Sequence, residues 1–146
     1  MIYTPLTKKA LCIAFDAHKE QVDKTGLPYV FHPFHLAEQM TDEISVCVAL
    51  LHDVIEDTDI TPEDLAAEGF PAAVLEAIAL LTHAPDVPYM DYVQEIGKNP
   101  VARAVKLADL THNSDLSRLD TVTEYDLARN EKYEKAKNLL MNEGET

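Results

Sequence analysis

The chain has 146 residues, of which 47% are hydrophobic and 26% are charged, an ordinary composition for one globular domain. Its 26 Asp and Glu residues outnumber its 12 Lys and Arg residues, which gives a formal net charge of −14. A surface this acidic repels phosphate backbones and anionic membrane faces, so we expect neither a nucleic acid nor a membrane as a partner. The sequence leaves the oligomeric state open.

The two cysteines, Cys12 and Cys47, lack the spacing of a zinc motif or a disulfide framework. Both lie among apolar residues, which predicts buried thiols. No apolar run reaches the roughly 18 residues that a membrane span needs, and the N-terminus lacks the order of a signal peptide. We therefore expect a reduced, cytoplasmic protein.

Helix signals begin at the N-terminus. Thr4 is a typical N-cap and Pro5 suits a first helical position, so we expect a helix that runs to about Gln21. Gly26 and Pro28 then interrupt the chain before a second helix over 32–40. A third helix is expected from residue 42 or 43 to about 57. Its segment 46–51 is almost wholly apolar, which predicts a central position in a helical bundle.

The second half of the chain repeats these signals. Thr61-Pro62-Glu63-Asp64 is an N-cap signature for a short fourth helix. The remaining expected helices span 71–82, 88–99, 101–117 and 123–140. Because no Asn-Gly or Asp-Gly hairpin signal occurs, we expect an all-α bundle of about eight helices.

Four titratable side chains follow the apolar segment: His52, Asp53, Glu56 and Asp57. Residues four apart share one helix face, which pairs His52 with Glu56 and Asp53 with Asp57. Carboxylates at a helix C-terminus oppose the helix dipole and repel one another unless a cation holds them. We interpret the group as a functional site, and the alternative is a solvated helix end.

A second candidate is Asp109, which has apolar neighbours and shares a helix face with Asn113. A salt bridge to Lys106 explains Asp109 equally well at this stage. Isolated histidines such as His18 and His35 are more typical of core or surface positions.

Taken together, these residues resemble the HD phosphohydrolase superfamily, and more closely the hydrolase domain of RelA/SpoT-type alarmone enzymes. The resemblance runs from about residue 6 to about residue 140. The matching stretches are AHKEQ at 17–21, GLPYVFHP at 26–33, ALLHDVIEDT at 49–58 and VKLAD at 105–109, with Asn113.

The resemblance implies an all-helical HD fold that binds one divalent metal, usually manganese. The implied metal ligands are His32, His52, Asp53 and Asp109. Glu56 and Asp57 match the pair that activates water and manages protons in this family. The implied substrate-binding residues are Lys24, Thr25, His83, Asn113 and Tyr133. RelA/SpoT enzymes also carry synthetase and regulatory domains, for which residues 1–146 leave no room, so we expect a single hydrolase domain.

The implied activity is hydrolysis of the 3′-pyrophosphate of (p)ppGpp, with release of pyrophosphate. Three positions that are basic in the family differ here: Asp23 replaces an Arg that packs on the base, and His83 and Asp115 replace two more. These changes favour an alternative, an HD phosphohydrolase that acts on another phosphorylated nucleotide. A third hypothesis is a metal-bearing module that binds an alarmone without chemistry, and the intact pair Glu56 and Asp57 speaks against it.

Overall fold

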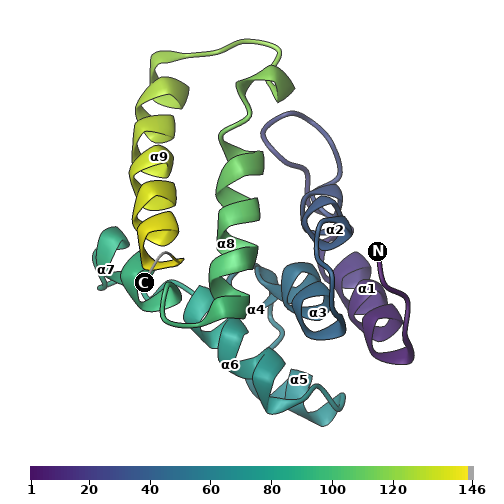
Figure 1. Ribbon diagram of the computed structural model, residues 1–146. Helices are drawn as coiled ribbons and strands as arrows, with labels where there is room; N and C mark the ends of the chain where they lie inside the picture. Colours follow the sequence, from purple (N-terminus) through teal and green to yellow (C-terminus); the bar gives the residue numbers. More distant parts are fainter. Residues whose placement is uncertain (145–146) are drawn as a thin grey trace.

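The computed structural model describes residues 1–144, and in that part of the chain it contains nine α-helices and one 3-10 turn, with no β-strand (Figure 1). The first five helices are α1 (Pro5–His18), α2 (Phe31–Glu38), α3 (Glu43–Leu51), α4 (Val54–Asp57) and α5 (Pro62–Ala67). They are followed by α6 (Ala72–Leu81), α7 (Tyr89–Ile96), α8 (Pro100–Asn113), the 3-10 turn η1 (Leu116–Arg118) and α9 (Glu124–Gly144). The predicted all-α class is confirmed.

Several predicted helix starts agree with the structure because side chains cap them. Thr4 accepts a hydrogen bond from the backbone N–H of Thr7 at the start of α1, and Thr61 accepts one from Asp64 at the start of α5. Several predicted helices end earlier than expected, two of them by four residues or more. The third stops at Leu51 and resumes as α4, which accounts for the extra helix, and the seventh ends at Asn113 before η1.

α3 lies at the centre of the bundle and packs against α1, α2, α6 and α8. Every residue from Ser45 to Leu51 is buried, as its apolar composition predicts. α8 and α9 run side by side from this centre toward the loops at one end (Figure 1). Cys47 on α3 is buried, but Cys12 on α1 is exposed, so the prediction for Cys12 is wrong. The core-facing side of α1 carries Ala10 and Ala14 instead.

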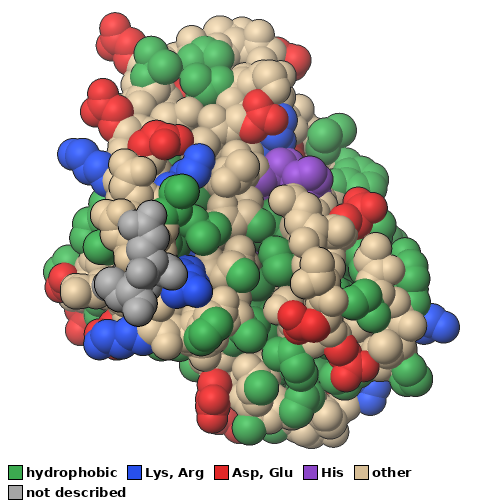
Figure 2. All heavy atoms as spheres, viewed as in Figure 1, with side chains coloured by type: hydrophobic (Ala, Val, Ile, Leu, Met, Phe, Trp, Pro, Cys, Tyr) green, Lys and Arg blue, Asp and Glu red, His purple; other side chains and the backbone are tan. Residues whose placement is uncertain are grey.

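Acidic side chains are spread over several elements of the face seen in Figure 2, and they do not form a single patch. Among the described residues, no helix combines the length and the apolar character that crossing a bilayer requires.

Candidate active site

The candidate site begins where α3 stops. α3 ends at Leu51, His52 is its C-cap residue, and α4 begins after Asp53. The Nδ1–H of His52 donates to the carbonyl of Ala49 at 2.7 Å, and in a continuous helix that carbonyl would accept from the N–H of Asp53. The prediction of one unbroken helix to Asp57 is therefore wrong, because the imidazole competes for the acceptor that would continue the helix.

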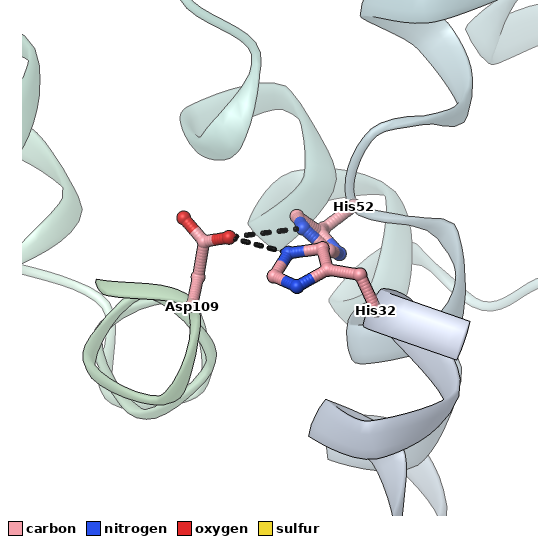
Figure 3. A group of neighbouring side chains, drawn as sticks. All are labelled: His32, His52 and Asp109. Atoms are coloured by element: carbon pink, nitrogen blue, oxygen red, sulfur yellow. Dashed lines mark hydrogen bonds and ion pairs between the residues drawn. The ribbon is translucent and has the colours of Figure 1, made fainter. Parts of the chain in front are cut away.

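Three of the four expected metal ligands converge in one buried cluster (Figure 3). His32 lies in the first turn of α2, His52 follows α3, and Asp109 lies on α8. The same carboxylate oxygen, Asp109 Oδ1, is 2.8 Å from His32 Nε2 and 3.6 Å from His52 Nε2. Candidate ligand atoms of the three residues all lie within 4.8 Å of one another. Ligand atoms that each lie about 2 Å from one shared ion are separated from one another by similar distances.

Asp109 is held from several sides. Lys106 Nζ donates to its Oδ2 at 3.0 Å, and Asn113 Nδ2 donates to its Oδ1 at 3.1 Å. The salt bridge to Lys106 that the sequence left open is thus present, together with the contacts to the two histidines. Burial alone would raise the pKa of Asp109, but Lys106, His32 and His52 outweigh burial and hold the pKa well below its ordinary value.

Asp53, the fourth expected ligand, contacts the cluster through His52. Its Oδ2 lies 2.9 Å from His52 Nε2 and accepts a hydrogen bond from the hydroxyl of Tyr29. Burial would lower the pKa of His52, but the carboxylates of Asp53 and Asp109 outweigh it and raise that pKa. Two carboxylates therefore face one imidazole at the same buried place.

These residues fit a divalent cation. His52 Nε2 is buried and has no hydrogen bond of acceptable geometry among the described residues, although Asp53 Oδ2 is close by. A buried, unbonded ring nitrogen aimed at carboxylates has the environment of a metal ligand. Imidazole nitrogens combined with carboxylate oxygens suit divalent transition ions.

Glu56 and Asp57, the expected catalytic pair, are exposed residues of the short helix α4, which begins directly after Asp53. Glu56 Oε1 accepts a hydrogen bond from the backbone N–H of His83 at 2.7 Å. Burial raises the pKa of Asp57, and the neighbouring charges of Asp53 and Glu56 raise it further. Asp57 thus takes up a proton more readily than an isolated Asp.

A cavity of about 300 Å³ adjoins the cluster at His32. Its lining includes three of the few cationic side chains of this acidic protein: Lys24, Arg118 and Arg129. The expected substrate-binding residues Asn113 and Tyr133 also line it. Burial and the neighbouring charge of Arg129 lower the pKa of Lys24. The cavity therefore gathers cationic side chains and hydrogen-bond donors beside the candidate metal ligands, and two of these cations are paired with carboxylates, Arg118 with Asp23 and Arg129 with Asp126.

Asp23 lines the same cavity, but its carboxylate is already engaged. It accepts hydrogen bonds from the N–H and hydroxyl of Thr25, the N–H of Leu27 and the guanidinium of Arg118, the last at 3.2 Å. Burial would raise the pKa of Asp23, and these donors lower it. Asp23 therefore organises the loop between α1 and α2 and holds Arg118, so its charge is largely compensated.

Three other expected or altered positions lie elsewhere. Neither Thr25 nor His83 lines the cavity beside His32. The hydroxyl of Thr25 donates to Asp23, and the ring of His83 packs on Tyr92 at a centroid distance of 4.4 Å. Asp115 is exposed and caps η1 through Ser117.

Sequence reasoning missed Arg118, Tyr29 and His112, which all contact residues of the site. Tyr29 lies three residues before the expected ligand His32, and His112 lies three residues after the expected ligand Asp109. This closeness in sequence was the only indication that they belong to the site. Arg118 gave no signal, because its contact with Asp23 joins residues 95 positions apart.

No protein-family model matches the chain. Curated relatives named guanosine-3′,5′-bis(diphosphate) 3′-pyrophosphohydrolase match it from Vibrio cholerae, at 35% identity over 63% of this chain, and from Aquifex aeolicus, at 32% identity over 88%. The bifunctional (p)ppGpp synthase/hydrolase SpoT of Escherichia coli K12 is 33% identical over 73% of the chain. The chain spans only 14%, 19% and 17% of the length of these three relatives, respectively.

A solved structure matches almost the whole fold. It is described as a metazoan ortholog of SpoT that hydrolyzes ppGpp, and the match has a TM-score of 0.77 at 25% sequence identity. The match covers 96% of this chain and 88% of that one. Fold, motif order and relatives agree, and the chain belongs to the family of RelA/SpoT-type HD hydrolase domains.

Proposed function

We propose that this chain is a metal-dependent phosphohydrolase that removes the 3′-pyrophosphate of (p)ppGpp and releases pyrophosphate in the cytoplasm, with residues 1–146 forming one hydrolase domain. The observation that carries the proposal is the buried cluster of His32, His52 and Asp109 beside a cavity lined by cations. The names of the relatives and of the solved structure support the choice of substrate.

His32, His52, Asp53 and Asp109 hold one divalent cation, for which we propose Mn²⁺. Two imidazoles and two carboxylates suit this ion and leave positions open in an octahedral shell. When bound, the cation supplies a Lewis acid that offsets negative charge on phosphate oxygens and promotes ionisation of water. Lys106 and Asn113 keep Asp109 oriented toward the two histidines.

Glu56 is the general base. The hydrogen bond from the backbone N–H of His83 to Oε1 holds the Glu56 carboxylate in place, and its other oxygen can accept a proton from a water molecule. Asp57, with its raised pKa, passes the proton onward to the leaving 3′-oxygen. Water thus cleaves the bond between the 3′-oxygen and its phosphorus. The hydroxyl of the water stays on the phosphorus, and its proton ends on the 3′-oxygen.

The substrate occupies the cavity beside His32. Lys24, Arg118 and Arg129 offset the charge of its phosphates within a protein whose net charge is −14. Asn113 and Tyr133 contribute hydrogen-bonding groups to the same cavity. Thr25 acts on the substrate through the loop that it shares with Asp23, and His83 acts through its hydrogen bond to Glu56.

A substrate panel tests the activity directly. With Mn²⁺ added, we expect pyrophosphate release from ppGpp, and no comparable release of phosphate or pyrophosphate from nucleoside monophosphates, GTP or a dinucleotide 2′-phosphate. Pyrophosphate and phosphate are measured separately. Faster phosphate release from another nucleotide would support the alternative phosphohydrolase, and ppGpp binding without any product would support a sensor.

The metal assignment predicts that His52→Ala loses the cation. Removing a ligand weakens binding by more than the roughly 10–100-fold that loss of a supporting residue costs. Elemental analysis of the purified protein measures the metal content, and His35→Ala is the matched control because His35 is an exposed histidine outside the proposed ligand set. Equal metal content in wild type and His52→Ala would refute the assignment.

The proposed base predicts a different result for Glu56→Gln. The amide oxygen can still accept from His83, so folding and metal content should be retained, but the proton acceptor is lost. We expect kcat to fall by at least about 100-fold. Glu76→Gln, an exposed position on α6, controls for the loss of one charge. Metal content that falls in step with kcat would make Glu56 a ligand.

Asp23→Arg tests the cavity. The change removes acceptors for Thr25, Leu27 and Arg118 and places two guanidinium groups together, so we expect KM for ppGpp to rise about 10-fold or more. kcat should stay nearly constant, because the loss affects ground state and transition state alike. Asp86→Arg makes the same charge change at an exposed loop position and serves as the control. A lower KM in Asp23→Arg would show that Asp23 only repels the substrate.

A further inference from the structure

Each histidine of the candidate metal cluster must present a ring nitrogen without a proton, so the other ring nitrogen must carry one. For His52 the backbone settles which nitrogen this is. A carbonyl can only accept, so the Nδ1 that lies 2.7 Å from Ala49 O carries the proton and Nε2 faces the carboxylates. The corresponding partner of His32 is a side chain.

His32 Nδ1 lies 2.7 Å from His112 Nδ1. The two rings are within 13° of parallel, and their centroids are 5.0 Å apart. The difference between the centroid distance and the N···N distance is about the sum of the two ring radii, which is expected when both nitrogens lie on the line between the ring centres. The two imidazoles therefore meet edge to edge and are not stacked face to face. This is the geometry of an N–H···N hydrogen bond, in which one ring donates and the other accepts.

The direction of this bond decides whether His32 can bind a cation. If His112 donated, a neutral His32 would carry its proton on Nε2, would donate it to Asp109 Oδ1 across the 2.8 Å contact, and would have no lone pair for a cation. If His112 accepts, the proton stays on His32 Nδ1, and a cation can replace the Nε2 proton between His32 and Asp109. Only the second arrangement is compatible with the metal site.

His112 is positioned by its place on α8 and by two contacts. It lies three residues after Asp109 on α8, so both side chains project from the same face of that helix. The ring of His35 packs against it at a centroid distance of 4.3 Å, and Arg118 donates to its backbone carbonyl at 2.9 Å. An imidazole fixed in this way can fix the ring of its neighbour.

We propose that His112 is a positioning residue of the metal centre, whose Nδ1 accepts the Nδ1–H of His32 and so directs the Nε2 lone pair of His32 toward the cation. The inference rests on the metal site of the proposed function, and it adds a residue outside the four ligands. It gives each histidine ligand its own orienting acceptor: the backbone of Ala49 for His52, and a side chain for His32.

The test compares two substitutions of His112. His112→Leu removes the acceptor, and we expect affinity for the metal to fall by about 10–100-fold. His112→Asn places an amide oxygen close to the position of the imidazole Nδ1, so it should restore affinity to within about threefold of wild type. His35→Ala removes the neighbouring ring but keeps the acceptor, so it should lose clearly less affinity than His112→Leu.

Affinity is measured on the full-length, metal-free chain by titration with Co²⁺, whose visible absorption reports the ligand environment, and with Mn²⁺ against a competing chelator. Circular dichroism of each metal-free variant checks that it folds. The inference is overturned if His112→Leu binds as tightly as wild type, or if His112→Asn or His35→Ala loses as much affinity as His112→Leu. A wild-type chain that binds neither ion would refute the metal site itself, and the inference with it. Because no nucleotide is used, failure on ppGpp leaves this result unaffected.

Discussion

The carboxylate of Asp109 is buried, with only 6% of the residue exposed, and a buried carboxylate is stable only when other groups satisfy it. In this protein those groups come from three parts of the chain. His32 is on α2, His52 follows α3, and Lys106 and Asn113 flank Asp109 on α8 itself. The requirement to satisfy one charge thus ties the centre of the bundle to the helix that packs across it, and it places two imidazoles against the same oxygen (Figure 3).

The break after α3 serves the same arrangement. A continuous helix would spread His52, Asp53, Glu56 and Asp57 around one axis. The break instead leaves His52 bonded to the carbonyl of Ala49, with its Nε2 toward Asp109, and it starts α4 with Glu56 and Asp57 at the edge of the cluster. The proposed ligand His52 therefore closes α3, and the proposed base lies on α4, which begins after the proposed ligand Asp53.

The net charge of the protein does not show where its few cationic side chains lie. The chain is strongly acidic, yet Lys24, Arg118 and Arg129 gather at one cavity beside His32. Asp23 also lies there, and its donors compensate its charge while it holds Arg118 in place. Within a negative overall field, these cations are thus confined to one cavity, where carboxylates hold Arg118 and Arg129 in place.

The sequence by itself determined the helical class, most helix starts and the central place of α3, because caps, prolines and apolar runs act over a few residues. It also determined, through motif order, which histidines and acids to expect at the site. The tertiary structure decided the rest: the break at His52, the pairing of Asp23 with Arg118 and the contact between His32 and His112. The last two join residues 95 and 80 positions apart. The break depends on which acceptor an imidazole reaches once it is buried. Helical periodicity in the sequence therefore could not predict any of the three.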